Sequence, residues 1–127
     1  MPASSPFVIL LAEDDPLVRN VVRTTLITAG YVVLDATDGA HALEMSRGYD
    51  GLIHVLLTDV VMPNMDGPTM ARHLRGQFGD IRLLFMSGYA EEQLRETISL
   101  DNVSFLPKPF SVQQIAEAVH DALAREG

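Results

Sequence analysis

Residues 7–16 read FVILLAEDDP, an unbroken apolar run that ends in three acidic residues and a proline. Continuous apolar residues are typical of a strand in a parallel sheet, where both faces are buried. Asp15 followed by Pro16 is typical of a helix N-cap and first helical position. The stretch therefore predicts a buried strand over residues 7–12, a loop carrying Glu13 and Asp14, and a helix beginning at residue 15 or 16.

The same alternation of apolar runs and helical patterns continues along the chain. Such alternation predicts an α/β fold with a parallel sheet covered by helices on both faces. Ligands of these sheets bind outside the carboxyl ends of the strands, so the residues at those ends are the ones to inspect. Further strands are expected over residues 31–36, 52–58, 81–86 and 103–106, and further helices after Asp38, near Pro68, over residues 91–100 and after Ser111.

Composition narrows the class of protein. The chain has 127 residues, the size of one domain, and its 47% hydrophobic content is enough for a core. A net charge of -8 argues against nucleic acid as a direct partner. The absence of cysteine excludes disulfides and thiolate zinc sites. We expect a flexible leader over residues 1–6, one domain over residues 7–125 without an output domain, no membrane insertion and a cytoplasmic location.

Polar side chains gather at the predicted strand ends: Glu13, Asp14, Asp59, Ser87 and Lys108, the only lysine of the chain. Two like charges about 4 Å apart repel by roughly 4 kcal/mol at an effective dielectric of about 20. Three carboxylates in one pocket would therefore be strained unless a cation offset their repulsion. Carboxylate oxygens suit Mg²⁺. An oxygen nucleophile, a metal, a lysine and a hydroxyl are what phosphoryl transfer needs. Taken singly, each residue is also consistent with helix capping, a turn or an exposed surface.

Four stretches carry a family resemblance: ILLAEDDP (9–16), LTDVVMPNMDG (57–67), FMSGY (85–89) and FLPKPF (105–110). In this order and at these distances they resemble the receiver domain of two-component response regulators, over about residues 7–125. The resemblance implies a flavodoxin-like, doubly wound (βα)5 fold whose five parallel strands have the order 2-1-3-4-5.

The resemblance also implies a role for each matching residue. Asp59 would accept the phosphoryl group in the presence of Mg²⁺ or Mn²⁺. Phe105 stands where the family has its switch aromatic, although it is equally consistent with a plain core residue. The implied set comprises the metal ligands Glu13, Asp14, Asp59 and the backbone carbonyl of Val61, the phosphate-binding and switch residues Ser87, Lys108 and Phe105, and the supporting loop residues Gly88 and Pro109.

The implied partners follow from the same resemblance. The phosphoryl donor would be a sensor histidine kinase or a histidine phosphotransfer protein, and the output a downstream effector protein. The responding surface would consist of the helix over residues 91–100, the strand over 103–106 and the last helix, which also leaves open a homodimer. The chain is similar to receivers of hybrid sensor histidine kinases, and a stand-alone receiver is the alternative.

Three rival functions share parts of this pattern. A degenerate receiver acting only as a protein-interaction module is the strongest, and the intact Asp14, Asp59 and Lys108 set counts against it. A flavin- or nucleotide-binding domain would need a phosphate-cradling loop where this chain has three acidic residues. A Mg²⁺-dependent phosphatase would need its nucleophile in the first loop and a substrate-covering cap.

Overall fold

The computed structural model describes residues 7–88, 98, 100 and 102–124. Its strands are β1 (Val8–Ala12), β2 (Val32–Ala36), β3 (Val55–Asp59), β4 (Arg82–Ser87) and β5 (Val103–Pro107). Its helices are α1 (Pro16–Thr28), α2 (Gly39–Gly48), α3 (Gly67–Gln77) and α5 (Val112–Ala124). The helix expected over residues 91–100 lies outside the described residues. Within the described part of the chain, no helix has the length and apolar character needed to cross a membrane.

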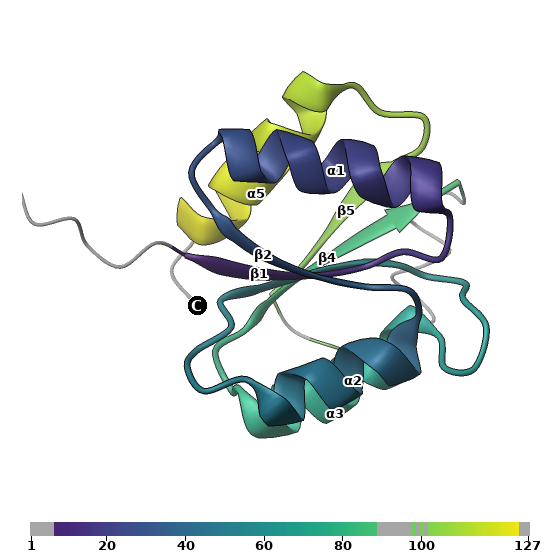
Figure 1. Cartoon of the computed structure of the whole chain (residues 1–127), viewed down its shortest axis with the longest axis vertical. Coiled ribbons are helices and arrows are strands. Elements are labelled where there is room, and N and C mark those ends of the chain that lie inside the picture. The colour runs from purple at the N-terminus through teal and green to yellow at the C-terminus, as the bar shows by residue number, and fades with distance from the viewer. Residues whose placement is uncertain (1–6, 89–97, 99, 101, 125–127) are drawn as a thin grey trace, which may run out of the picture.

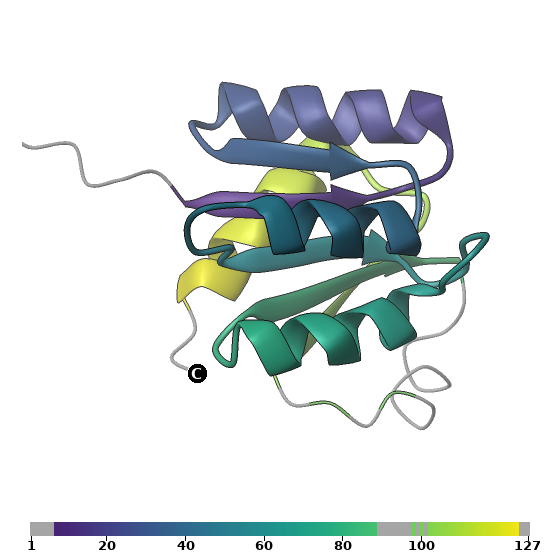
Figure 2. The ribbon, with the colours of Figure 1, turned by 60° about the horizontal axis from the view of Figure 1, so that its bottom comes forward.

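The five strands are parallel and form one sheet in the order β2-β1-β3-β4-β5, which confirms the predicted fold class. Helices α1 and α5 cover one face of the sheet, and α2 and α3 cover the other (Figure 1). Figure 2, in which α2 and α3 are turned forward, shows these two helices in front of the strands and α5 behind them. The architecture is therefore the three-layer arrangement that alternating strands and helices predict.

Alternate residues of β1 build two separate cores. Ile9 and Leu11 pack with Val22 and Leu26 of α1 in one cluster, whereas Leu10 belongs to the cluster on the side of α2 and α3. All five residues of β1 are buried. Successive side chains of a strand point to opposite faces, so a central strand with both faces covered must be apolar throughout.

Strand boundaries differ from the expected ones at β3. The strand begins at Val55, not at residue 52, and ends on Asp59. Leu52 is 68% exposed and precedes the sheet. The ring Nδ1 of His54 accepts a hydrogen bond from the Val8 backbone N–H at 3.0 Å. An apolar run alone cannot show where its neighbours begin to pair with it, which is why the predicted start was wrong.

The helix starts follow from side-chain caps. Asp15 accepts a hydrogen bond from the Leu17 N–H at 2.9 Å, and Asp38 accepts one from the His41 N–H at 2.8 Å. Both caps were predicted from sequence, and each satisfies a backbone donor that the first turn leaves without a helical partner. Asp66, which sequence analysis did not single out, caps α3 in the same way.

Candidate functional site

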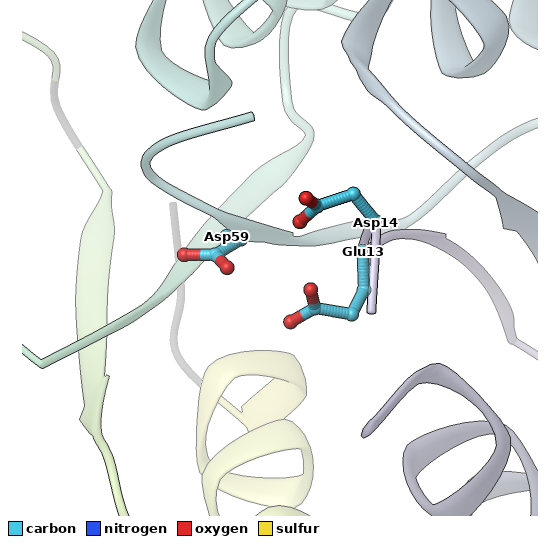
Figure 3. A group of neighbouring side chains, drawn as sticks. All are labelled: Glu13, Asp14 and Asp59. Atoms are coloured by element: carbon cyan, nitrogen blue, oxygen red, sulfur yellow. The ribbon is translucent and has the colours of Figure 1, made fainter. Parts of the chain in front are cut away.

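Three carboxylates meet at the carboxyl ends of β1 and β3. Figure 3 shows the side chains of Glu13 and Asp14 directed toward Asp59. One carboxylate oxygen of each lies within 4.8 Å of the others. The Glu13 side chain is 1% exposed and that of Asp59 is 16% exposed, whereas Asp14 is exposed. The cluster is thus a partly buried acidic site with one side open to solvent.

Lys108, directly after β5, brings a positive charge to this site. Its Nζ lies 2.9 Å from Oδ2 of Asp59 and 3.3 Å from Oε1 of Glu13. Burial alone would lower the pKa of Lys108, but the hydrogen bonds and negative charges of Asp59 and Glu13 outweigh it and raise that pKa. The lysine therefore stays protonated and places a positive charge beside Asp59 and Glu13.

Glu13 is the most buried member of the cluster. Burial raises the pKa of its carboxyl above the usual range, and the charge of Asp59 adds to this. The Asp15 backbone N–H, 3.0 Å from Oε2, and Lys108 act in the opposite direction. A raised pKa means that negative charge is costly at this position. A divalent cation would relieve that cost, and three carboxylates supply the hard oxygen ligands that Mg²⁺ prefers, so the residues fit this ion.

The loop after Asp59 is held close to it. Oδ1 of Asp59 accepts a hydrogen bond from the Val60 N–H at 2.8 Å, and the Val60 carbonyl accepts one from the Gly67 N–H at 2.9 Å. A Cβ at Gly67 would collide with the Asp59 carbonyl oxygen, so only glycine fits here. The Val61 side chain is 63% exposed, and the role of its carbonyl as a metal ligand stays a prediction.

The same loop is tied to the start of α2. Asn64, which has a positive φ of 71°, donates from Nδ2 to Oδ2 of Asp38 at 2.7 Å. Gly39 packs so tightly that a Cβ there would collide with the Met65 carbonyl. The sequence shows proline, asparagine and glycine in the stretch MPNMDG (62–67) but does not reveal this attachment, because Asn64 and Asp38 are 26 residues apart.

The remaining predicted residues lie at the ends of β4 and β5. Ser87 ends β4, is 4% exposed, and pairs with Pro107 of β5. Its carbonyl accepts a hydrogen bond from the Lys108 N–H at 2.8 Å, which couples the two positions. Gly88 and Pro109 are exposed, and the Lys108–Pro109 peptide bond is cis.

Phe105 points into the core face that β4 shares with α3. Its ring stacks on Phe85 with centroids 6.0 Å apart and an interplanar angle of 28°. The side chain is half-buried, so this packing is compatible with a core residue as well as with an aromatic that changes position. Its role as a switch stays a prediction.

Arg19 is a neighbour of the site that sequence analysis missed. Its Nη1 donates to the Glu13 carbonyl oxygen at 2.8 Å. The only sequence signal is its place in the first turn of a helix that follows the acidic loop. That signal is weak, because a basic residue on a helix is usually a solvated one.

Comparison with known proteins gives a single family. The family model described as "Response regulator receiver domain" matches residues 9–120. The sensor kinase CckA of Brucella abortus (strain 2308) is 41% identical over 119 residues, which are 93% of this chain and 13% of CckA. The response regulator receiver protein CpdR of the same strain is 34% identical over 116 residues, 91% of this chain and 95% of CpdR.

Solved structures agree with these relatives. The receiver domain of the hybrid histidine kinase CckA has a TM-score of 0.79 at 39% identity, covering 91% of this chain and 98% of that one. The Vibrio cholerae chemotaxis protein CheY4 has a TM-score of 0.85 at 26% identity, covering 94% of this chain and all of that one. Sequence and fold therefore lead to the same conclusion: the chain belongs to the response regulator receiver domain family.

Proposed function

We propose that this chain is the phosphoacceptor receiver of a two-component phosphorelay, and that Asp59 takes a phosphoryl group from a phosphohistidine. The contact between Asp59 Oδ2 and Lys108 Nζ, 2.9 Å long and beside two further carboxylates, is the observation that carries the proposal. It combines an oxygen nucleophile, a fixed cation and a set of metal ligands in one partly open site.

Glu13, Asp14, Asp59 and the Val61 carbonyl would hold Mg²⁺, with Mn²⁺ as a substitute. When bound, the ion supplies positive charge to the phosphoryl oxygens. The chain's own residues orient the nucleophile, because the Val60 N–H binds one Asp59 oxygen and Lys108 binds the other. A carboxylate oxygen forms the new bond to phosphorus as the phosphorus–nitrogen bond of the donor breaks, and the imidazole leaves with the electron pair of that bond.

The response would begin at Ser87 and Lys108. Their backbones are hydrogen-bonded at 2.8 Å, so a shift of Ser87 toward the phosphoryl group is transmitted to the residue that pairs with Asp59. Phosphorylation adds charge and acceptor oxygens that favour such a shift. The affected surface comprises β5, α5, and the segment over residues 91–100. We propose this surface as the site for an effector protein or for a homodimer.

The similarity to the receiver of CckA supports a sensor histidine kinase or a histidine phosphotransfer protein as the donor in the cytoplasm, and a place within a hybrid kinase. The likeness to CpdR over nearly its whole length supports a stand-alone receiver instead. Neither a nucleic acid nor a membrane is a proposed partner.

The test is the intact mass of the protein after incubation with Mg²⁺ and acetyl phosphate. We expect one phosphoryl group on the parent chain and none on Asp59→Asn. Asp66→Asn is the matched control, because Asp66 is an exposed carboxylate whose capping role asparagine can take over. A parent chain that gains no mass, with no Mg²⁺ binding, would leave a receiver fold used only for protein interaction.

A further inference from the structure

Arg19 reaches back from the first turn of α1 to the acidic loop. Its Nη1 donates to the Glu13 carbonyl oxygen at 2.8 Å, and its Nε lies 3.8 Å from Oδ2 of Asp35 on β2. We propose that Arg19 is a positioning residue, which holds Glu13 and Asp14 in the geometry that binds Mg²⁺. This inference rests on the proposed function, in which those carboxylates hold the ion.

The hydrogen bonds of Glu13 show what Arg19 adds. The Glu13 N–H bonds to the Ala36 carbonyl at 3.2 Å. The two carboxylate oxygens bond to the Asp15 N–H at 3.0 Å and to Lys108 at 3.3 Å. The carbonyl is the remaining polar group of the residue, and a charged donor holds it. Every polar group of Glu13 is therefore engaged, and Arg19 is the side chain that fixes the peptide leading to Asp14.

Asp14 depends on that peptide for its position. Its side chain is exposed, yet one of its oxygens lies within 4.8 Å of ligand atoms of Glu13 and Asp59. An exposed carboxylate keeps such a place only if the backbone beneath it is fixed. Rotation of the Glu13–Asp14 peptide would turn the Asp14 side chain away from the other two ligands. Arg19 resists this rotation because a hydrogen bond from a charged donor is stronger than a neutral one.

Geometry and not charge is the basis of this role. Arg19 contacts a backbone carbonyl and Asp35, so its guanidinium is not paired with the three carboxylates of the site. A planar guanidinium presents several donors in fixed directions and can address both partners at once, whereas the ammonium of a lysine is a point charge on a flexible stem without that fixed geometry. Its side chain is 19% exposed, which limits the competition from water.

The experiment measures the Mg²⁺ dissociation constant by NMR titration of backbone amides in the parent, Arg19→Ala, Arg19→Lys and Arg23→Ala. Arg23 is the matched control: it lies one turn further along α1, and its guanidinium contacts Oδ1 of Asn20 at 3.0 Å. Repeating the titration at about 0.5 M salt screens long-range charge effects but leaves a direct contact in place. Thermal unfolding in EDTA shows whether each variant is folded without metal.

We expect Arg19→Ala to bind Mg²⁺ about tenfold more weakly than the parent, as is typical when a residue behind a metal ligand is removed. Arg19→Lys should bind Mg²⁺ with intermediate affinity, because lysine keeps the charge but not the fork of donors. Arg23→Ala should bind within about twofold of the parent, because it leaves the contact between Arg19 and the Glu13 carbonyl in place. Parent-like affinity in Arg19→Ala, or in Arg19→Lys if the alanine variant is unfolded, would overturn the inference. Equal losses in Arg19→Ala and Arg23→Ala would also overturn it. A parent chain that binds no Mg²⁺ would instead refute the proposed function, and this inference with it.

Discussion

Gly67 and Gly76 lie in the same helix, α3, but we expect alanine to have opposite effects at the two positions. At Gly67 an added Cβ would collide with the carbonyl oxygen of Asp59 and come within 3.2 Å of Cγ2 of Thr58. The obstacle is the backbone of Asp59, the proposed phosphoacceptor, so the loop must move. At Gly76 an added Cβ would meet no heavy atom within 4 Å outside the backbone of its own helix.

The magnitudes follow from these surroundings. Overpacking a close contact costs about 1–3 kcal/mol, so Gly67→Ala should lower the free energy of unfolding by that amount. Gly76→Ala should raise it by about 0.5–1 kcal/mol, because alanine loses less conformational entropy than glycine in a helix. For a domain of this size, 1 kcal/mol corresponds to about 4 °C in the melting temperature.

Urea unfolding followed by circular dichroism measures both variants against the parent. An unchanged dependence on urea would show that only stability has changed. Gly67→Ala should also take up phosphoryl groups from acetyl phosphate more slowly, because displacement of the Asp59 backbone moves its carboxylate away from Lys108. If Gly67→Ala is as stable as Gly76→Ala, the close approach of α3 to Asp59 does not constrain the fold, and the reasoning is refuted.

Three further changes test the electrostatics and the caps. Lys108→Met should lower the free energy of unfolding by about 1–3 kcal/mol in EDTA, since it leaves Glu13 and Asp59 without their cation. Saturating Mg²⁺ should restore part of this loss, and an equal loss with and without Mg²⁺ would contradict the prediction. Burial lowers the pKa of His54 below its ordinary value of 6.5, so the unfolded chain binds the proton more tightly and stability should fall as pH drops from about 7 to about 5. His54→Gln should flatten this dependence in urea titrations at several pH values, and an unchanged slope would assign it to other groups. Asp38→Ala should lower the free energy of unfolding by at least about 1 kcal/mol, because it removes both the cap and the hydrogen bond from Asn64, whereas Asp38→Ser should recover the share that belongs to the cap in the same assay.

Local chemistry made much of the fold predictable. The apolar run of residues 7–12 identified a central strand because both faces of β1 are covered. Asp15 and Asp38 marked helix starts because a cap acts within three residues of itself. The β3 start was wrong because residues 52–54 are apolar enough to resemble a strand but precede the paired region. The order of the strands came only from the family resemblance, since no local pattern encodes it.

The candidate site also has features that the sequence predicts and features that it does not. Its residue types and their positions at strand ends could be identified from the chain, as could the likeness to receiver domains that the comparisons confirmed. The sequence could not show that Lys108 lies between Glu13 and Asp59, which are 95 and 49 residues away from it. Nor could it show the contact of Arg19 with the Glu13 carbonyl or the collision that excludes a side chain at Gly67.

The sequence by itself determined where the five strands occur along the chain, the caps at Asp15 and Asp38, and the kinds of chemical group at the carboxyl edge of the sheet. These features depend on contacts between near neighbours in the chain and on the period of the apolar residues. Only the tertiary structure decided the distances between those groups, the burial of Glu13 and the attachment of each loop. These follow from how helices and strands far apart in the chain pack together, which is a property of the whole molecule and of no single segment.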